Sequence, residues 1–153
     1  MKNKYLETLL LYYEEEIMGE GYFIALSEHF IEPHQKEKML LMAKVESHAA
    51  KAILPLIRKY KLIPRANRLL KDIGKKGLKK VNHLTWEEFI HDIYVEFPKY
   101  LVEFDELERI APESDIGMLK TLTDHEVAAI EFARLEMEGN TNSIDPLMQY
   151  MEN

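Results

Sequence analysis

The segment "LYYEEEIMGEGYF", residues 11–23, decides the fold class and raises a question of charge. Wound as an α-helix at about 100° per residue, it places Glu20 near the middle of an apolar stripe that includes Tyr13 and Phe23. Glu16 lies about 40° to one side of Glu20 on the same helix. The segment therefore predicts a long helix that turns carboxylates toward the core of the protein.

Helical periodicity of the same kind recurs along the chain. Four long stretches show it, and no stretch shows sustained two-residue alternation, so we expect an all-α fold. The approximate limits of these stretches are residues 5–30, 35–60, 85–110 and 115–138. Pro98 should kink the third stretch, and a short tail helix is expected at about residues 143–152.

The connections predict how these helices are arranged. The joints after the first and the third helix are short, so each pair should form an antiparallel hairpin. Residues 61–84, between the second and third helices, are long enough to cross the length of a bundle. We therefore expect residues 1–153 to form a single domain, an antiparallel four-helix bundle of two helical hairpins joined by a long crossover.

Composition and charge disfavour several classes of function. The chain of 153 residues has a formal net charge of −7 at pH 7, which argues against nucleic-acid and anionic-membrane surfaces. It has no cysteine, so any metal ligands must be Glu, Asp or His. The N-terminal segment meets three glutamates before it could form a signal peptide or a membrane span. We expect a cytoplasmic protein that has neither nucleic acid nor a membrane as its partner.

Inward carboxylates are predicted on the other helices as well. Glu46 falls within the apolar arc of the second helix, and Glu126 falls within that of the fourth. Glu96 and Glu103 lie on one shoulder of the third helix. Glu20, Glu46, Glu96 and Glu126 each fall within about three residues of the midpoint of their helix, so we expect them to converge on one level.

Carboxylates that converge in an apolar core need a compensating charge. Desolvation of an ionised carboxylate costs several kcal/mol, and mutual repulsion adds to that cost. No lysine or arginine falls on the inner arcs of the four predicted helices near this level. One or two bound ions of iron or manganese would neutralise the group. Protonated carboxyls with raised pKa values are the alternative.

The glutamate in "MGEGYF", the inward glutamates of the second and third helices, and "DHE" on the fourth helix resemble the ferritin-like superfamily of carboxylate-bridged dinuclear metal proteins. The resemblance covers about residues 5–138. In that superfamily the second and fourth helices each carry Glu-x-x-His, whose two side chains bind the same pair of metal ions. Here Ala49 and Ala129 stand three residues after Glu46 and Glu126, in place of both expected histidines.

The histidines of this chain are offset from that pattern. His125, beside Glu126 on the shoulder of the inner arc, can serve as a metal ligand, or it can cap an edge of the core. If His48 and His125 were instead the motif histidines, the matching glutamate positions would hold Val45 and Leu122. That interpretation leaves both inward carboxylates unused, and we disfavour it.

The resemblance implies a metal-binding protein, and its enzymatic form would be a di-iron-type oxidoreductase that acts with dioxygen or peroxide on a small-molecule substrate. The expected metal ligands are Glu20, Glu46, Glu96, His125 and Glu126. Three further residues, Glu16, Tyr100 and Glu103, are expected to support these ligands by hydrogen bonding or to carry protons. The alternative is a metal-free helical binding protein whose carboxyls are protonated or hold a cationic ligand. A homodimer is compatible with both interpretations.

Overall fold

The computed structural model describes residues 2–152, and over that range the chain is all-helical, with no β-strand. The all-α class predicted from the sequence is confirmed. The elements in chain order are α1 (Lys2–His29), α2 (Pro33–Lys59), α3 (Asn67–Lys75), η1 (Lys76–Lys80), α4 (Trp86–Glu96), α5 (Pro98–Ile110), η2 (Glu113–Asp115), α6 (Ile116–Met137) and α7 (Asp145–Glu152). Within residues 2–152, none of the helices is both long and apolar enough to cross a membrane.

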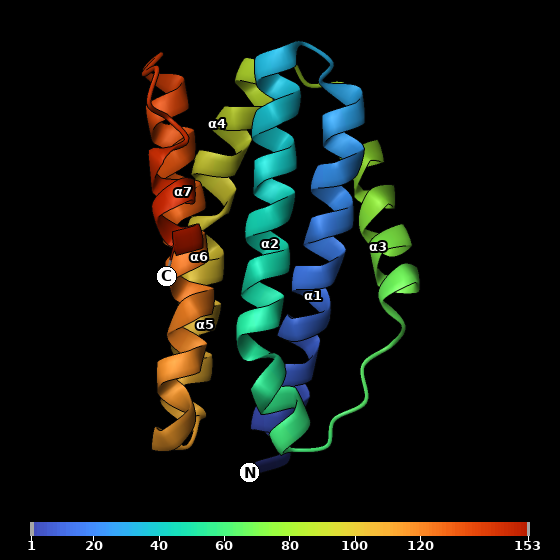
Figure 1. The fold of residues 1–153 in the computed structure, drawn as a ribbon, viewed down its shortest axis with the longest axis vertical. Coiled ribbons are helices and arrows are strands. Elements are labelled where there is room, and N and C mark those ends of the chain that lie inside the picture. The colour runs from blue at the N-terminus through green and yellow to red at the C-terminus, as the bar shows by residue number, and fades with distance from the viewer. Residues whose placement is uncertain (1, 153) are drawn as a thin grey trace.

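The long helices run along a common axis. Figure 1 shows α1 beside α2, with α3 packed against α1 and α7 against α6. Helix α6 contacts α2 as well as α4 and α5. The expected crossover, residues 61–84, contains α3 and η1, and the predicted tail helix is α7. The helix expected at residues 85–110 is divided at Pro98, which takes the first position of α5.

Part of the inward face of each long helix follows a seven-residue repeat, with spacings that alternate between four and three. On α1 this series is Tyr5, Leu9, Tyr12, Glu16, Gly19, Phe23 and Leu26, and the buried residues Tyr13 and Ile17 lie beside it. On α2 it is Met39, Met42, Glu46, Ala49, Ile53 and Leu56, and on α6 it is Leu119, Leu122, Glu126, Ala129 and Ala133. Because an α-helix has 3.6 residues per turn, a face with this repeat moves around the helix by about 20° every seven residues.

A buried acid joins three helices at one end of the molecule. The carboxylate of Asp115, which is 0% exposed, accepts hydrogen bonds from the hydroxyls of Tyr5, at 2.8 Å, and Tyr60. The ammonium of Lys59 also donates to it at 2.7 Å. Together these contacts hold the pKa of the Asp115 carboxyl below its usual value, although burial alone would raise it. Asp115 therefore has a full set of donors and a cationic partner.

A second acid has the same kind of partners near the opposite end. The carboxylate of Glu136 accepts hydrogen bonds from Lys38 at 2.7 Å, from Trp86 Nε1 at 3.1 Å and from Ser143 at 2.8 Å. The pKa of Glu136 is lowered by these donors, against the effect of burial. Both ends of the fold thus pair their enclosed acids with a lysine.

Helix α3 of the crossover lies in backbone contact with α1. A Cβ atom added to Gly74 would lie 1.8 Å from the carbonyl oxygen of Met18, and one added to Gly21 would lie 2.2 Å from the carbonyl oxygen of Lys71. Neither backbone could give way without moving its helix. Glycine at these two positions therefore fixes the distance between α1 and α3.

We predict that Gly74→Ala lowers the free energy of unfolding by about 2 kcal/mol or more, because the added methyl group must push α3 away from α1. Urea unfolding followed by circular dichroism measures this change.

Gly117→Ala is the matched control. Apart from its chain neighbours and the adjacent backbone of α6, no atom of the described residues lies within 4 Å of a Cβ added to Gly117, so this substitution should leave the stability unchanged or raise it by up to about 1 kcal/mol through helix propensity. Equal effects of the two substitutions would contradict the close approach of α3 to α1.

Candidate functional site

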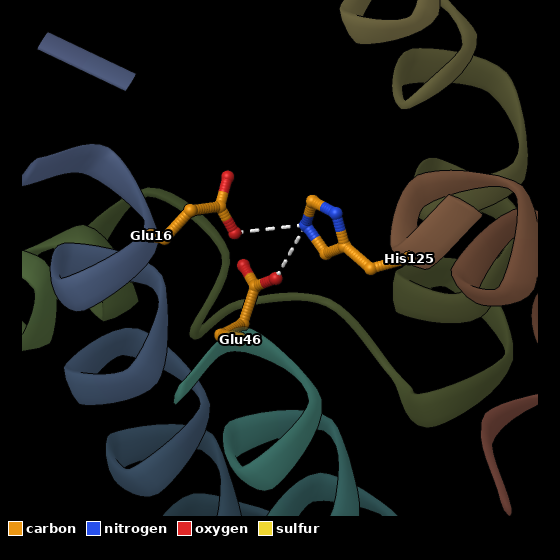
Figure 2. A group of neighbouring side chains, drawn as sticks. All are labelled: Glu16, Glu46 and His125. Atoms are coloured by element: carbon orange, nitrogen blue, oxygen red, sulfur yellow. Dashed lines mark ion pairs between the residues drawn. The ribbon is translucent and has the colours of Figure 1, made fainter. Parts of the chain in front are cut away.

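His125 of α6 lies halfway along the molecule and meets carboxylates from two other helices. Its Nε2 atom is 2.8 Å from Oε1 of Glu16 and 2.9 Å from Oε2 of Glu46. Figure 2 shows these three side chains converging from α1, α2 and α6. Oε1 of Glu126 lies 3.7 Å from the same nitrogen. These four residues, Glu16, Glu46, Glu126 and His125, are called the central cluster.

The side chains of the central cluster are almost fully buried. His125 is 1% exposed, Glu126 is 4% exposed and Glu16 is 5% exposed, whereas the side chain of Glu46 keeps 15% of its surface. One ligand atom from each of Glu16, Glu46 and His125 can be chosen so that all three lie within 4.8 Å of one another. Such a group has the dimensions of a site for one cation.

The backbone of α6 sets the orientation of the imidazole. Nδ1 of His125 contacts the carbonyl oxygen of Leu122, and a carbonyl can only accept a hydrogen bond, so Nδ1 carries a proton. In neutral histidine Nε2 is then unprotonated and turns its lone pair toward the carboxylates. Because this nitrogen and the carboxylate oxygens all carry lone pairs, a proton or a metal ion is needed between Nε2 and the carboxylates. Donation from the second ring nitrogen to a backbone carbonyl is the usual arrangement of a metal-bound histidine.

Burial and mutual repulsion shift the protonation of the central cluster. Burial, followed by the charge of Glu16, raises the pKa of Glu46 to about 8. Burial also raises the pKa of Glu126 well above its usual value. Burial alone would lower the pKa of His125, but the charges and contacts of Glu16 and Glu46 outweigh it and raise that pKa. In the absence of a metal, protons on these groups reduce the charge of the cluster at neutral pH.

Protons do not satisfy every polar atom of the cluster. Oε1 of Glu16 is buried without a hydrogen bond of adequate geometry, although it lies 2.8 Å from Nε2 of His125. A single N–H on Nε2 cannot point at both Glu16 and Glu46. In the ion pairs of residues 2–152, these carboxylates meet His125 and no lysine or arginine. Among the described residues, His125 is therefore the cationic partner of all three carboxylates, whereas the enclosed acid at each end of the fold has a lysine.

Gly19 makes room for the carboxylate of Glu46. A Cβ atom added to Gly19 would lie 2.2 Å from Oε1 of Glu46 and 3.0 Å from its Cδ. Gly19 follows Glu16 by three residues in the seven-residue repeat of α1, so it faces the same interior. The carboxylate of Glu46 thus rests against the backbone of α1.

A cavity of about 670 Å³ reaches the central cluster from the side of the crossover. Glu16, Glu46 and Glu126 all line it, together with residues of α3, η1, α4 and α5. Tyr100 also lines it, and burial together with the charge of Glu126 raises the pKa of this tyrosine. Small molecules therefore have space beside the carboxylates.

Helix α7 covers the imidazole. The ring centroid of Tyr150 lies 6.1 Å from that of His125 and 5.1 Å from that of His48. The hydroxyl of Tyr150 is buried without a hydrogen-bond partner among the described residues, and burial is the main cause that raises its pKa to about 12. No motif in the sequence indicated that the tail helix would reach the site.

Three of the five expected ligands, Glu46, Glu126 and His125, come together, and Glu20 does not join them. The carboxylate of Glu20 faces α3, where it pairs with Lys71 at 3.5 Å. The expected position of Glu20 is thus corrected for two reasons. The side chain of Glu16, not that of Glu20, meets His125, and Lys71 of the crossover supplies the cation that pairs with Glu20.

The acids of the third predicted helix also stay outside the central cluster. The side chain of Glu96 is 52% exposed and pairs with Lys99 at 3.6 Å, although Glu96 lines the same cavity. Glu103 is partly buried, and its charge adds to the effect of burial that raises the pKa of Tyr12. The expected convergence of Glu96 is corrected, because α4 ends at this residue where Pro98 interrupts the helix.

No protein-family model, curated protein or solved structure matches the chain. What the protein does is therefore inferred from the geometry of the central cluster.

We predict that the metal-free protein loses stability as the pH rises from about 5 to 8. Folded Glu46 has a pKa of about 8, whereas an ordinary glutamate has one near 4.5, so between these values the folded state holds a proton that the unfolded state releases. Each proton that is bound in the folded state and released on unfolding lowers the free energy of unfolding by up to about 1.4 kcal/mol for every unit by which the pH rises.

Urea unfolding in the presence of EDTA, repeated across this pH range, measures the slope. Glu46→Gln should flatten it, while Glu37→Gln, an exposed acid on α2, should keep the wild-type slope. An unchanged slope in Glu46→Gln would show that this carboxyl does not hold the proton.

Proposed function

We propose that this protein binds one divalent transition-metal ion, iron or manganese, through the four side chains of the central cluster. Within residues 2–152, one imidazole is the cationic partner of this enclosed set of carboxylates, while Asp115 and Glu136 at the ends of the fold each have a lysine and further donors. This contrast within one molecule is the observation that supports the proposal best.

The donor chemistry supports iron or manganese. Carboxylate oxygens suit magnesium, calcium and manganese, and imidazole suits zinc, copper, iron and nickel, so a mixed oxygen and nitrogen set is compatible with iron or manganese. His125 already turns Nε2 toward the carboxylates through the contact of Nδ1 with Leu122. An ion among these atoms would also give the buried Oε1 of Glu16 a partner.

The number of donors favours one ion. The ferritin-like pattern for two ions uses Glu-x-x-His on two helices and a glutamate from each of the other two. Here Ala49 and Ala129 occupy the histidine positions, and Glu96 pairs with Lys99 instead of joining the cluster. One imidazole and three carboxylates remain, which is a set for a single ion.

We further propose that the fold is an antiparallel four-helix bundle of the ferritin-like kind. Helices α1, α2 and α6 together with the broken α4–α5 pair would be its four members, and the crossover with α3 and η1 would join its two hairpins. Contacts of α1 with α2, of α2 with α6, and of α6 with both α4 and α5 support this arrangement.

A bound iron or manganese ion would supply Lewis acidity and one-electron redox chemistry. With the cavity beside it, the activity that we propose is that of an oxidoreductase acting with dioxygen or peroxide on a small molecule. A cytoplasmic location belongs to the same proposal.

Elemental analysis after exposure to iron(II) or manganese(II), with protein purified without an affinity-metal step, tests the proposal. We predict about one ion per chain in the wild type and background metal in Glu46→Gln, because that substitution removes a charged ligand. Glu20→Gln is the matched control one helical turn after Glu16 on α1, and it should keep the wild-type content. Background metal in the wild type would overturn the proposal.

The same measurement tests whether Gly19 positions the ligand. Gly19→Ala should weaken metal binding at least about tenfold, because its methyl group displaces the carboxylate of Glu46. Adding Glu46→Asp should restore part of the affinity, since the shorter side chain withdraws from the methyl group. Wild-type affinity in Gly19→Ala would contradict the close contact.

A further inference from the structure

The cavity beside the central cluster has the size of a small-molecule site. Its volume is about 670 Å³, and sites for small ligands typically measure about 300–1,000 Å³. It lies between α1, the crossover and the α4–α5 pair, and the carboxylates of Glu16, Glu46 and Glu126 form part of its wall. The proposed metal ion would fill only a small part of this space.

Aromatic rings form much of the remaining wall. They come from α1 and from the junction of α4 and α5, and they are Tyr22, Phe23, Phe97, Tyr100 and Phe104. Phe97 and Tyr100 pack edge to face, with ring centroids 5.6 Å apart. Such rings favour an apolar body, and their faces attract a cation.

The charged lining of the cavity is predominantly acidic. Six acids line it, Glu15, Glu16, Glu46, Asp92, Glu96 and Glu126, against the lysines Lys80 and Lys99. Lys99 is already paired with Glu96 at 3.6 Å and lies 5.4 Å from the ring centroid of Tyr100. Even with Glu46 and Glu126 protonated, the acids outnumber the lysines. An anionic ligand would therefore be repelled.

Glu16 joins this lining from the central cluster. Its side chain is 7% exposed and lines the cavity, while its Oε1 lies 2.8 Å from Nε2 of His125. An acidic surface alone is common on proteins of this net charge, but here the acids line a cavity of ligand size together with aromatic rings.

We infer that the cavity binds an organic ammonium ion, a primary amine carried on an aromatic or aliphatic body. Its N–H groups donate to the acidic lining, and its body packs against the aromatic rings. The inference rests on the cavity and does not require the metal ion. It names the chemical class of small molecule that the proposed oxidoreductase would admit.

Isothermal titration calorimetry with three probes of matched shape tests this inference: phenethylamine, 2-phenylethanol and 3-phenylpropionate. Each is titrated into the metal-free and the manganese-exposed protein. We expect phenethylamine to bind at least about tenfold more tightly than the alcohol, and the carboxylate to bind more weakly than the alcohol. Equal affinities for the amine and the alcohol, tighter binding of the carboxylate, or no binding of any probe would overturn the inference.

Asp92→Asn provides the variant outside the central cluster. Asp92 lines the cavity and is only partly exposed, so its loss should weaken phenethylamine binding at least about threefold and leave the alcohol unaffected. Asp105→Asn, whose parent side chain is 71% exposed on α5, is the matched control and should change neither affinity. Unchanged amine binding in Asp92→Asn would contradict the role of the acidic lining.

Glu46→Gln separates this inference from the proposed metal site. If metal content falls to background while the preference for the amine persists, both proposals stand. If the wild type binds no metal but prefers the amine, the metal proposal fails and the cavity inference stands. If metal binds and the amine is not preferred, only the cavity inference fails.

Discussion

The rest of this structure depends on one constraint: three carboxylates are buried together, and no lysine or arginine of the described residues pairs with them. Glu16, Glu46 and Glu126 meet around one imidazole. Burial of each charge costs free energy, and in residues 2–152 these three carboxylates share His125 as their cationic partner, whereas the enclosed acid at each end of the fold has its own lysine. The bound cation that we propose would resolve that imbalance, and in its absence burial and mutual repulsion favour protons on the carboxyls.

Several features that would weaken an ordinary helical core are explained by this constraint. Gly19 costs helix stability in the interior of α1, yet a side chain there would collide with the carboxylate of Glu46. Nδ1 of His125 is tied to the carbonyl of Leu122, which holds the ring in place. The crossover is held against α1 through Gly21 and Gly74, and it forms one wall of the cavity. At these positions glycine lowers helix propensity but leaves the space that the carboxylate of Glu46 and the backbone of the crossover occupy.

Much of this could be predicted from the sequence, because periodicity fixes which faces are apolar. The all-α class and the inward position of Glu46 and Glu126 follow from that signal, and the break at Pro98 follows from the proline itself. Glu20 was favoured over Glu16 because Tyr13 and Ile24 shift the centre of the predicted apolar stripe toward Glu20. Ile24 is only partly buried, and the buried side chains of Tyr5, Leu9 and Phe23 centre the inward face nearer to Glu16.

Other features depended on segments distant in sequence. Lys71 reaches Glu20 only because the crossover returns along α1, and Tyr150 reaches His125 only because α7 folds back over α6. Neither contact has a local signal, since both depend on how the connections run. The alanines in place of the two expected histidines indicated an altered donor set, and the interior is consistent with this, with a single imidazole among three carboxylates.

Anomalous X-ray diffraction from crystals soaked in manganese(II) tests the central claim most directly. The account predicts one strong peak per chain, within about 2.5 Å of carboxylate oxygens from Glu16 and Glu46 and of Nε2 from His125. No peak at this position after soaking, or a peak at Glu20 with the central cluster unchanged, would contradict it.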